Sequence, residues 1–224
     1  MIRSIGQPVA LTWRYDTTEL WVDGVVHAIG LVLALVAATL LAIACVGQTP
    51  DWTTTSALIY AASLTATLGV SAAYNMWPVS PKKWLLRRFD HSAIYLLIAA
   101  TYTPFITQLK NDVLSAGVLC ALWFVAIIGM MMKLLLPGRL DRLSILLYLL
   151  LGWSGLVLYE PLISTLPQSI FWHIAVGGFL YSIGVIFHVW ERLRFQNAIW
   201  HGFVLAGAAC HYKAVLDCVS LANV

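Results

Sequence analysis

The chain has 224 residues, of which 61% are apolar and only 10% are charged. Soluble globular domains are about 45–50% apolar and about 25% charged, so the composition excludes a soluble domain. Its hydrophobicity also excludes a disordered chain. An all-α membrane protein remains, and its function must be sought in the few polar residues inside or beside its apolar segments.

Seven apolar runs come close to the roughly 20 residues that a helix needs to cross the hydrocarbon core of a bilayer. In chain order, the predicted spans are 25–46, 56–77, 91–109, 113–132, 143–159, 170–190 and 198–216. The fifth is the shortest and is bounded by Pro161. The runs are continuous, which is not the alternating pattern of a membrane β-barrel. The sequence therefore predicts a short N-terminal segment (1–24) and a single seven-helix transmembrane domain (25–221).

The basic residues are distributed very unevenly among the connections. Of the 13 lysines and arginines, 11 lie before the first span or in the second, fourth and sixth connections, and only Lys110 and Lys213 lie elsewhere. The 11 are Arg3, Arg14, Lys82, Lys83, Arg87, Arg88, Lys133, Arg139, Arg142, Arg192 and Arg194. Basic residues accumulate on the cytoplasmic side of membrane proteins. We therefore expect a multi-pass protein of the cell inner (plasma) membrane with its N-terminus in the cytoplasm and its C-terminus outside.

With this orientation, most polar residues of the spans fall at the cytoplasmic ends. They are His27, Ser71, Asn75, Asp90, His91, His188, Asn197 and His201, while only His173 and His211 lie toward the other side. Each residue alone could be an interfacial helix cap, as Asp90 could be for the third span. Together they predict a site, because ionisable groups in spans are costly and are usually functional.

The spacing of these residues is that of a metal site. Ser71 and Asn75 are four residues apart, as are Asn197 and His201, so each pair shares one face of its helix. Imidazole suits Zn²⁺, whereas an amide oxygen is better matched to Ca²⁺ or Mg²⁺. The two asparagines therefore make this an unusual site for zinc.

Three stretches of the sequence carry a family resemblance. They are SAAYN at 71–75, FDHSAIYLLIAATYTPF at 89–105 and AIWHGFVLAGAACHY at 198–212. They resemble the hemolysin III family, the bacterial branch of the progestin and adipoQ receptor superfamily, which includes the adiponectin receptors. This resemblance implies a seven-helix protein with a cytoplasmic N-terminus, in agreement with the charge distribution.

The resemblance also implies a zinc site. The family pattern is Ser-xxx-His on the second helix, Asp opening the third and His-xxx-His on the seventh, with the three histidines on zinc and the Asp holding a zinc-bound water. Ser71, Asp90 and His201 match this pattern. Asn75 and Asn197 stand at the other two ligand positions.

Two further positions of the first span also match family positions. His27 matches another histidine that is common in the family, and Asp23 stands where the family often has an asparagine. Because two of the three zinc histidines are missing, we expect a degenerate site with no tightly held zinc. The protein would then act in membrane-lipid homeostasis or regulation, with membrane lipids as partners and no nucleic acid.

The main alternative is an active metal-dependent lipid amidase or esterase. The family resembles hydrolases in which zinc lowers the pKa of a bound water that attacks an amide or ester carbonyl. Asp90 would then deprotonate the water and Ser71 would support the site. His27, His91 and His188 are the candidates for additional metal ligands.

A proton pathway and a pore-forming or cytolytic protein are further alternatives. Histidines at both ends of the bilayer are compatible with a proton pathway. The family name suggests a cytolysin, but no span has the polar face along its full length that a water-filled channel needs.

Overall fold

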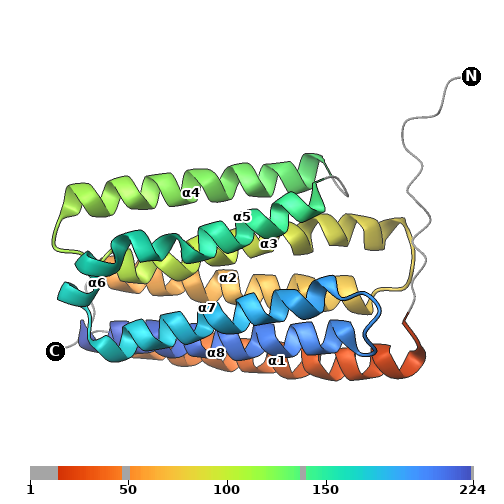
Figure 1. Ribbon diagram of the computed structural model, residues 1–224. Coiled ribbons are helices and arrows are strands. Elements are labelled where there is room, and N and C mark those ends of the chain that lie inside the picture. The colour runs from red at the N-terminus through yellow and green to blue at the C-terminus, as the bar shows by residue number, and fades with distance from the viewer. Residues whose placement is uncertain (1–14, 47–50, 137–139, 223–224) are drawn as a thin grey trace, which may run out of the picture.

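The computed structural model describes residues 15–46, 51–136 and 140–222, which form an all-α bundle of roughly parallel and antiparallel helices (Figure 1). The helices are α1 (Thr17–Ala44), α2 (Asp51–Met76), α3 (Pro81–Ile106), α4 (Asp112–Leu135), α5 (Asp141–Trp153), the 3-10 helix η1 (Ser154–Leu158), α6 (Tyr159–Thr165), α7 (Gln168–Val189) and α8 (Gln196–Leu221). Three of the basic residues counted above, Arg3, Arg14 and Arg139, lie outside the described residues.

Six of the predicted spans correspond to helical segments that are long and apolar enough to cross a membrane. They are Thr17–Ala44, Trp52–Met76, Asp112–Leu135, Asp141–Thr165, Gln168–Val189 and Gln196–Leu221. The remaining predicted span, 91–109, falls in α3 up to its end at Ile106. This helix packs against α2, α4, α5 and α8 and buries most of its second half. A helix surrounded by protein needs less apolar surface than one that faces lipid. The protein is therefore a multi-pass membrane protein with six candidate spans among the described residues.

The outer surface of the bundle is apolar. Large side chains on several helices are more than half exposed, including Val32 at 60%, Phe124 at 66% and Leu150 at 59%. The interior contains buried polar groups such as Ser56 and Ser144. In water such a large exposed apolar surface would favour association, whereas in a bilayer it is the surface that faces lipid.

The first helix begins at Thr17 and not near residue 25, where the first span was predicted to start. Asp16 and Glu19 explain the difference, because they form a reciprocal capping box in which each side chain accepts the other's backbone N–H. Glu19 also accepts the backbone N–H of Phe195 at 2.8 Å, which ties the start of α1 to the start of α8. As a consequence, Asp23 lies well inside α1.

The fifth span also differs from its prediction. We expected it to be bounded by Pro161, but the helical segment continues through α6 to Thr165. Pro161 lies in the first turn of α6, where the missing N–H has no partner within the helix in any case. The α-helix is interrupted slightly earlier by the 3-10 helix η1, where Tyr102 accepts a hydrogen bond from the backbone N–H of Gly155 at 3.0 Å.

Several contacts join the helix ends at the end of the bundle where α1 begins. Asp141 at the start of α5 pairs with Arg87 of α3 at 2.9 Å and with Lys133 of α4 at 2.6 Å. The buried ammonium of Lys83 donates to the carbonyls of Asn75 and Trp77 at the end of α2, at 3.0 and 2.8 Å. These contacts bring the ends of α2 and α4 together with the starts of α3 and α5.

Candidate functional site

One cavity of about 900 Å³ runs between the helices. Most of the polar residues singled out in the sequence line it: His27, Ser71, Asn75, Asp90, His91, His188, Asn197, His201 and His211. Farther along α3, α7 and α8 the lining is richer in apolar side chains, which include Leu97, Ile98, Phe105, Phe171 and Val204, and its polar members there are Thr101, Tyr102, Tyr181 and His211. The cavity therefore has a polar end and an apolar end.

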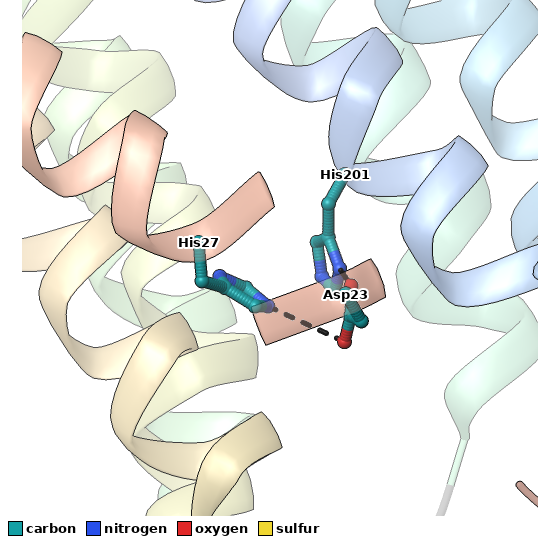
Figure 2. Close-up of side chains that lie close together, drawn as sticks. All are labelled: Asp23, His27 and His201. Atoms are coloured by element: carbon teal, nitrogen blue, oxygen red, sulfur yellow. Dashed lines mark hydrogen bonds and ion pairs between the residues drawn. The ribbon is translucent and has the colours of Figure 1, made fainter. Parts of the chain in front are cut away.

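The polar side chains at this end gather around the carboxylate of Asp23, which lies behind the cavity wall and is only 2% exposed. One oxygen, Oδ1, lies 2.7 Å from Nδ1 of His201. The other, Oδ2, accepts a hydrogen bond from Asn197 at 2.7 Å and lies 3.6 Å from Nε2 of His27. Figure 2 shows the two rings, from α1 and α8, turned toward this carboxylate.

His27 and His201 also face each other. Their ring centroids are 4.2 Å apart, and both residues are buried. Asp23 and His27 are four residues apart on α1, so they share one helix face. The capping box at Asp16 and Glu19 therefore matters for the site, because it extends α1 far enough to include Asp23.

The two asparagines continue this network. The Asn197 amide donates to Oδ1 of Asn75 at 3.0 Å, as well as to Asp23. Asn75 in turn donates to the carbonyl of Ser71 at 2.9 Å, one turn earlier on α2. Hydrogen bonds therefore link α1, α2 and α8 through Asp23, Asn197 and Asn75.

Tyr15 and Gln196 hold α1, α7 and α8 together beside the site. The Tyr15 hydroxyl donates to the Gln196 side chain at 2.8 Å, and the Gln196 amide donates to the carbonyl of His188, also at 2.8 Å. Burial and the nearby carboxylate of Asp23 raise the pKa of the Tyr15 phenol above its ordinary value. Tyr15 therefore stays protonated and remains a hydrogen-bond donor at neutral pH.

The other histidines lie apart from Asp23. His91 and His188 both line the cavity, but the His91 ring packs edge-on against Tyr74 and the His188 ring packs against Trp200. Toward the other end of the bundle, His211 faces the Ile174 carbonyl at 3.1 Å. Within the described ranges, the group with metal-ligand spacing is Asp23, His27 and His201.

The residues at the family's zinc positions do not fit a three-histidine site. At positions 75 and 197 the side chains are amides that are hydrogen-bonded to each other. The Asn197 nitrogen is a donor without a lone pair for a metal, and His201 directs Nδ1 at Asp23. The side chains at positions 75, 197 and 201 therefore form a hydrogen-bonded polar cluster and not a set of three metal ligands.

Asp23 is the central residue that the sequence did not identify as part of the site. In the sequence Asp23 stands out only as the counterpart of a family asparagine, because the predicted first span begins after it. Its spacing of four residues from His27 is a signal that could have found it. This spacing becomes informative once the capping pattern from Asp16 to Glu19 is used to begin the helix at residue 17.

Comparisons with known proteins agree with the predicted resemblance. The Haemolysin-III related family profile matches residues 15–212. The chain is 34% identical over 194 residues to a hemolysin-3 homolog of Bacillus subtilis, covering 87% of this chain and 91% of that protein. It is 44% identical over 127 residues to hemolysin-3 of Bacillus cereus, covering 57% and 58%.

A more distant relative extends the similarity beyond bacteria. The human monocyte to macrophage differentiation factor is 30% identical over 172 residues, covering 73% of this chain and 70% of that protein. The family match spans the polar cluster from Asp23 to His201 as well as the membrane helices. The chain is therefore an integral membrane protein that belongs to the Haemolysin-III related family.

Proposed function

We propose that this protein binds a membrane lipid inside the bundle and acts in membrane-lipid homeostasis or its regulation, without zinc-dependent hydrolysis. The observation that carries the proposal is the division of the cavity into a polar end and an apolar end. From Asp90 to Phe105, α3 extends the cavity wall by roughly 22 Å, at 1.5 Å per residue. An acyl chain would occupy the apolar part and the head group would meet the polar cluster.

The volume and lining of the cavity support a small hydrophobic ligand. Pockets for such ligands measure about 300–1,000 Å³ and have apolar walls with a few fixed polar groups. The cavity of about 900 Å³ lies in this range. Because the lining Asp, Glu, Lys and Arg side chains are confined to one end, the same lining argues against a continuous water-filled pore.

Membrane topology is part of the proposal. We infer seven spans, with α3 as the third, a cytoplasmic N-terminus, an outside C-terminus and one transmembrane domain over residues 25–221. The polar end of the cavity would then face the cytoplasm. The basic connections support this orientation, because Lys82, Lys83, Arg87 and Lys133 all lie on helix ends near the polar cluster.

A cavity-filling variant tests lipid binding. Ala175 of α7 lines the cavity, so Ala175→Phe should place a ring in the space of the acyl chain. We expect a several-fold drop in the lipid that co-purifies with the protein in detergent, measured by mass spectrometry per mole of chain. Ala121→Phe is the matched control, because Ala121 lies on the exposed face of α4 away from the cavity. Equal lipid content in the two variants would contradict the proposal.

The second candidate function is an active lipid amidase or esterase. It is favoured by one observation, that Ser71, Asp90 and His201 share the cavity wall. Asp90 would accept a proton from the attacking water, and Ser71 would support that carboxylate. Release of fatty acid from ceramide-like or phospholipid substrates by the wild type, and its loss in Asp90→Asn, would establish this function in place of the first.

A further inference from the structure

We propose that Asp23, His27 and His201 form an exchangeable site for a divalent transition-metal cation, displaced toward α1 from the three-histidine arrangement. One ligand atom from each residue lies within 4.8 Å of the other two. The residues are only 2%, 6% and 8% exposed. Figure 2 shows both imidazole rings beside the Asp23 carboxylate. The ligands thus come from only two helices, α1 and α8, with none from α2.

An unpartnered nitrogen points to a missing ligand. Nε2 of His27 is buried and makes no hydrogen bond to any described residue. The nearest carboxylate oxygen, Oδ2 of Asp23, is 3.6 Å away, which is beyond hydrogen-bonding distance. Buried polar side-chain atoms normally have a partner. A cation bound between His27 and Asp23 would give the His27 Nε2 atom a partner.

The charge of the cluster favours a cation as well. The ion pairs described for Asp23 are both with histidines, His27 and His201. Besides these contacts, the Lys83 ammonium acts on Asp23 electrostatically. Because a buried carboxylate is costly without positive charge nearby, a divalent cation at Asp23 would add to the compensation that Lys83 gives.

The ligand types indicate the class of cation. Two imidazoles and one carboxylate form a donor set for Zn²⁺ and other first-row divalent ions, with coordination positions left open for water or a ligand. His27 and His201 line the cavity, whereas Asp23 lies behind them. The open positions would therefore face the cavity.

The same contacts explain why the ion would exchange. Asp23 already accepts a hydrogen bond from Asn197 at 2.7 Å and lies 2.7 Å from His201. A cation has to replace the contact with His201 before it can bind. We therefore expect binding that a chelator reverses, in keeping with the absence of a complete three-histidine set.

The test is a titration of the full chain in detergent with Co²⁺ alone, after chelator treatment and with an affinity tag that contains no histidine. We expect visible d–d absorption that saturates at one Co²⁺ per chain and is displaced by Zn²⁺. His27→Gln and Asp23→Asn should each weaken Co²⁺ binding at least tenfold. His173→Gln is the control, because His173 contacts the Ser169 carbonyl away from the cluster, and it should bind like the wild type.

Two further measurements distinguish loss of the metal site from loss of folding or of a family ligand position. Thermal melting of each variant checks that it is folded, and if Asp23→Asn is not, His27→Gln decides. Asn75→Ala removes a family ligand position without touching the proposed ligands, so Co²⁺ binding should survive. The proposal is overturned if the wild type shows no saturable absorption, or if His27→Gln binds like the wild type. The site is independent of lipid binding, since the absorption requires no lipid and the lipid measurement requires no metal.

Discussion

At the scale of single residues, Asn197 decides what the polar cluster can do. Its amide nitrogen lies within hydrogen-bonding distance of both Asp23, at 2.7 Å, and Asn75, at 3.0 Å. A zinc ligand must offer a lone pair, whereas this nitrogen only donates hydrogen bonds. Asn197 therefore joins Asp23 and Asn75 by hydrogen bonds. A histidine at this position, as in the family pattern, would instead offer a ring nitrogen to a metal.

Restoring two imidazoles should restore a tight zinc site. We predict that the double variant Asn75→His, Asn197→His retains about one zinc per chain after exhaustive dialysis, because it adds two nitrogen ligands to His201. The wild type should retain much less. Full sets of Cys or His ligands hold structural zinc with apparent energies of about 10–16 kcal/mol, and His201, the one histidine left at the three family positions, cannot supply most of this.

The single variants provide the control for this prediction. Either substitution alone leaves at most two of the three imidazoles, so each should restore little zinc by elemental analysis. If one single variant retained as much zinc as the double variant, the three-histidine geometry would be wrong for this chain. Stoichiometric zinc in the dialysed wild type would show that the cluster around Asp23 binds metal more tightly than we infer.

The polar cluster also shows how far single residues can be predicted from sequence. The spacing of Ser71, Asn75, Asn197 and His201 placed them on shared helix faces, and all four line the cavity. Asp23 was not predicted as a site residue, because hydropathy marks where a chain becomes apolar and not where its helix begins. The beginning of α1 depends on a local hydrogen-bonding pattern, the capping box at Asp16.

At the scale of the elements, close contact between α7 and α8 holds one wall of the cavity. A Cβ atom added at Gly177 would lie 2.4 Å from the His211 ring and 3.1 Å from the Gly207 carbonyl. His211 cannot easily move away, because its Nε2 lies 3.1 Å from the Ile174 carbonyl. Small residues therefore allow the two helices to approach, as is common in membrane helix packing.

A matched pair of alanine substitutions tests this contact. Gly177→Ala should reduce the free energy of unfolding by about 1–3 kcal/mol, the usual effect of overpacking. A Cβ at Gly202, on α8, would meet nothing within 4 Å. Gly202→Ala should therefore stabilise the helix by up to about 1 kcal/mol. Thermal unfolding in detergent measures both, and equal shifts in the two variants would show that α7 and α8 are not in tight contact at Gly177.

Hydropathy predicted the helices that face lipid better than those shaped by protein contacts. Six segments are apolar enough to be recognised by composition. The second half of α3 is mostly buried by its neighbours, so it tolerates threonines and tyrosines that lower its hydropathy. The sequence nevertheless predicted a span at 91–109, but it did not predict the break at η1, where the backbone N–H of Gly155 contacts Tyr102 across the bundle. This break has no local sequence signal as clear as an apolar run.

At the scale of the whole molecule, polarity is arranged in two directions. Across the bundle, apolar side chains lie outside and many polar side chains lie inside. Along it, the ion pairs of Asp141 and the cluster at Asp23 lie at the end where α1 begins, and α8 finishes at the opposite end (Figure 1). A lipid that enters from the bilayer could thus keep its chain at membrane depth while its head group reaches the polar end.

This arrangement predicts a definite topology, and α3 is its critical element. If α3 crosses the membrane, reporters fused to the two termini should report opposite compartments, with the N-terminus in the cytoplasm. The reason is the bias of 11 of 13 basic residues toward one side.

Two internal reporters test α3 directly. A reporter inserted between α3 and α4, near Lys110, should lie outside, and one inserted between α2 and α3, near Val79, should lie in the cytoplasm. If the reporters near Val79 and Lys110 reported the same compartment, α3 would not be a span, and both termini would then lie on one side. The polar end of the cavity would keep its geometry, but the compartment it faces would have to be assigned again.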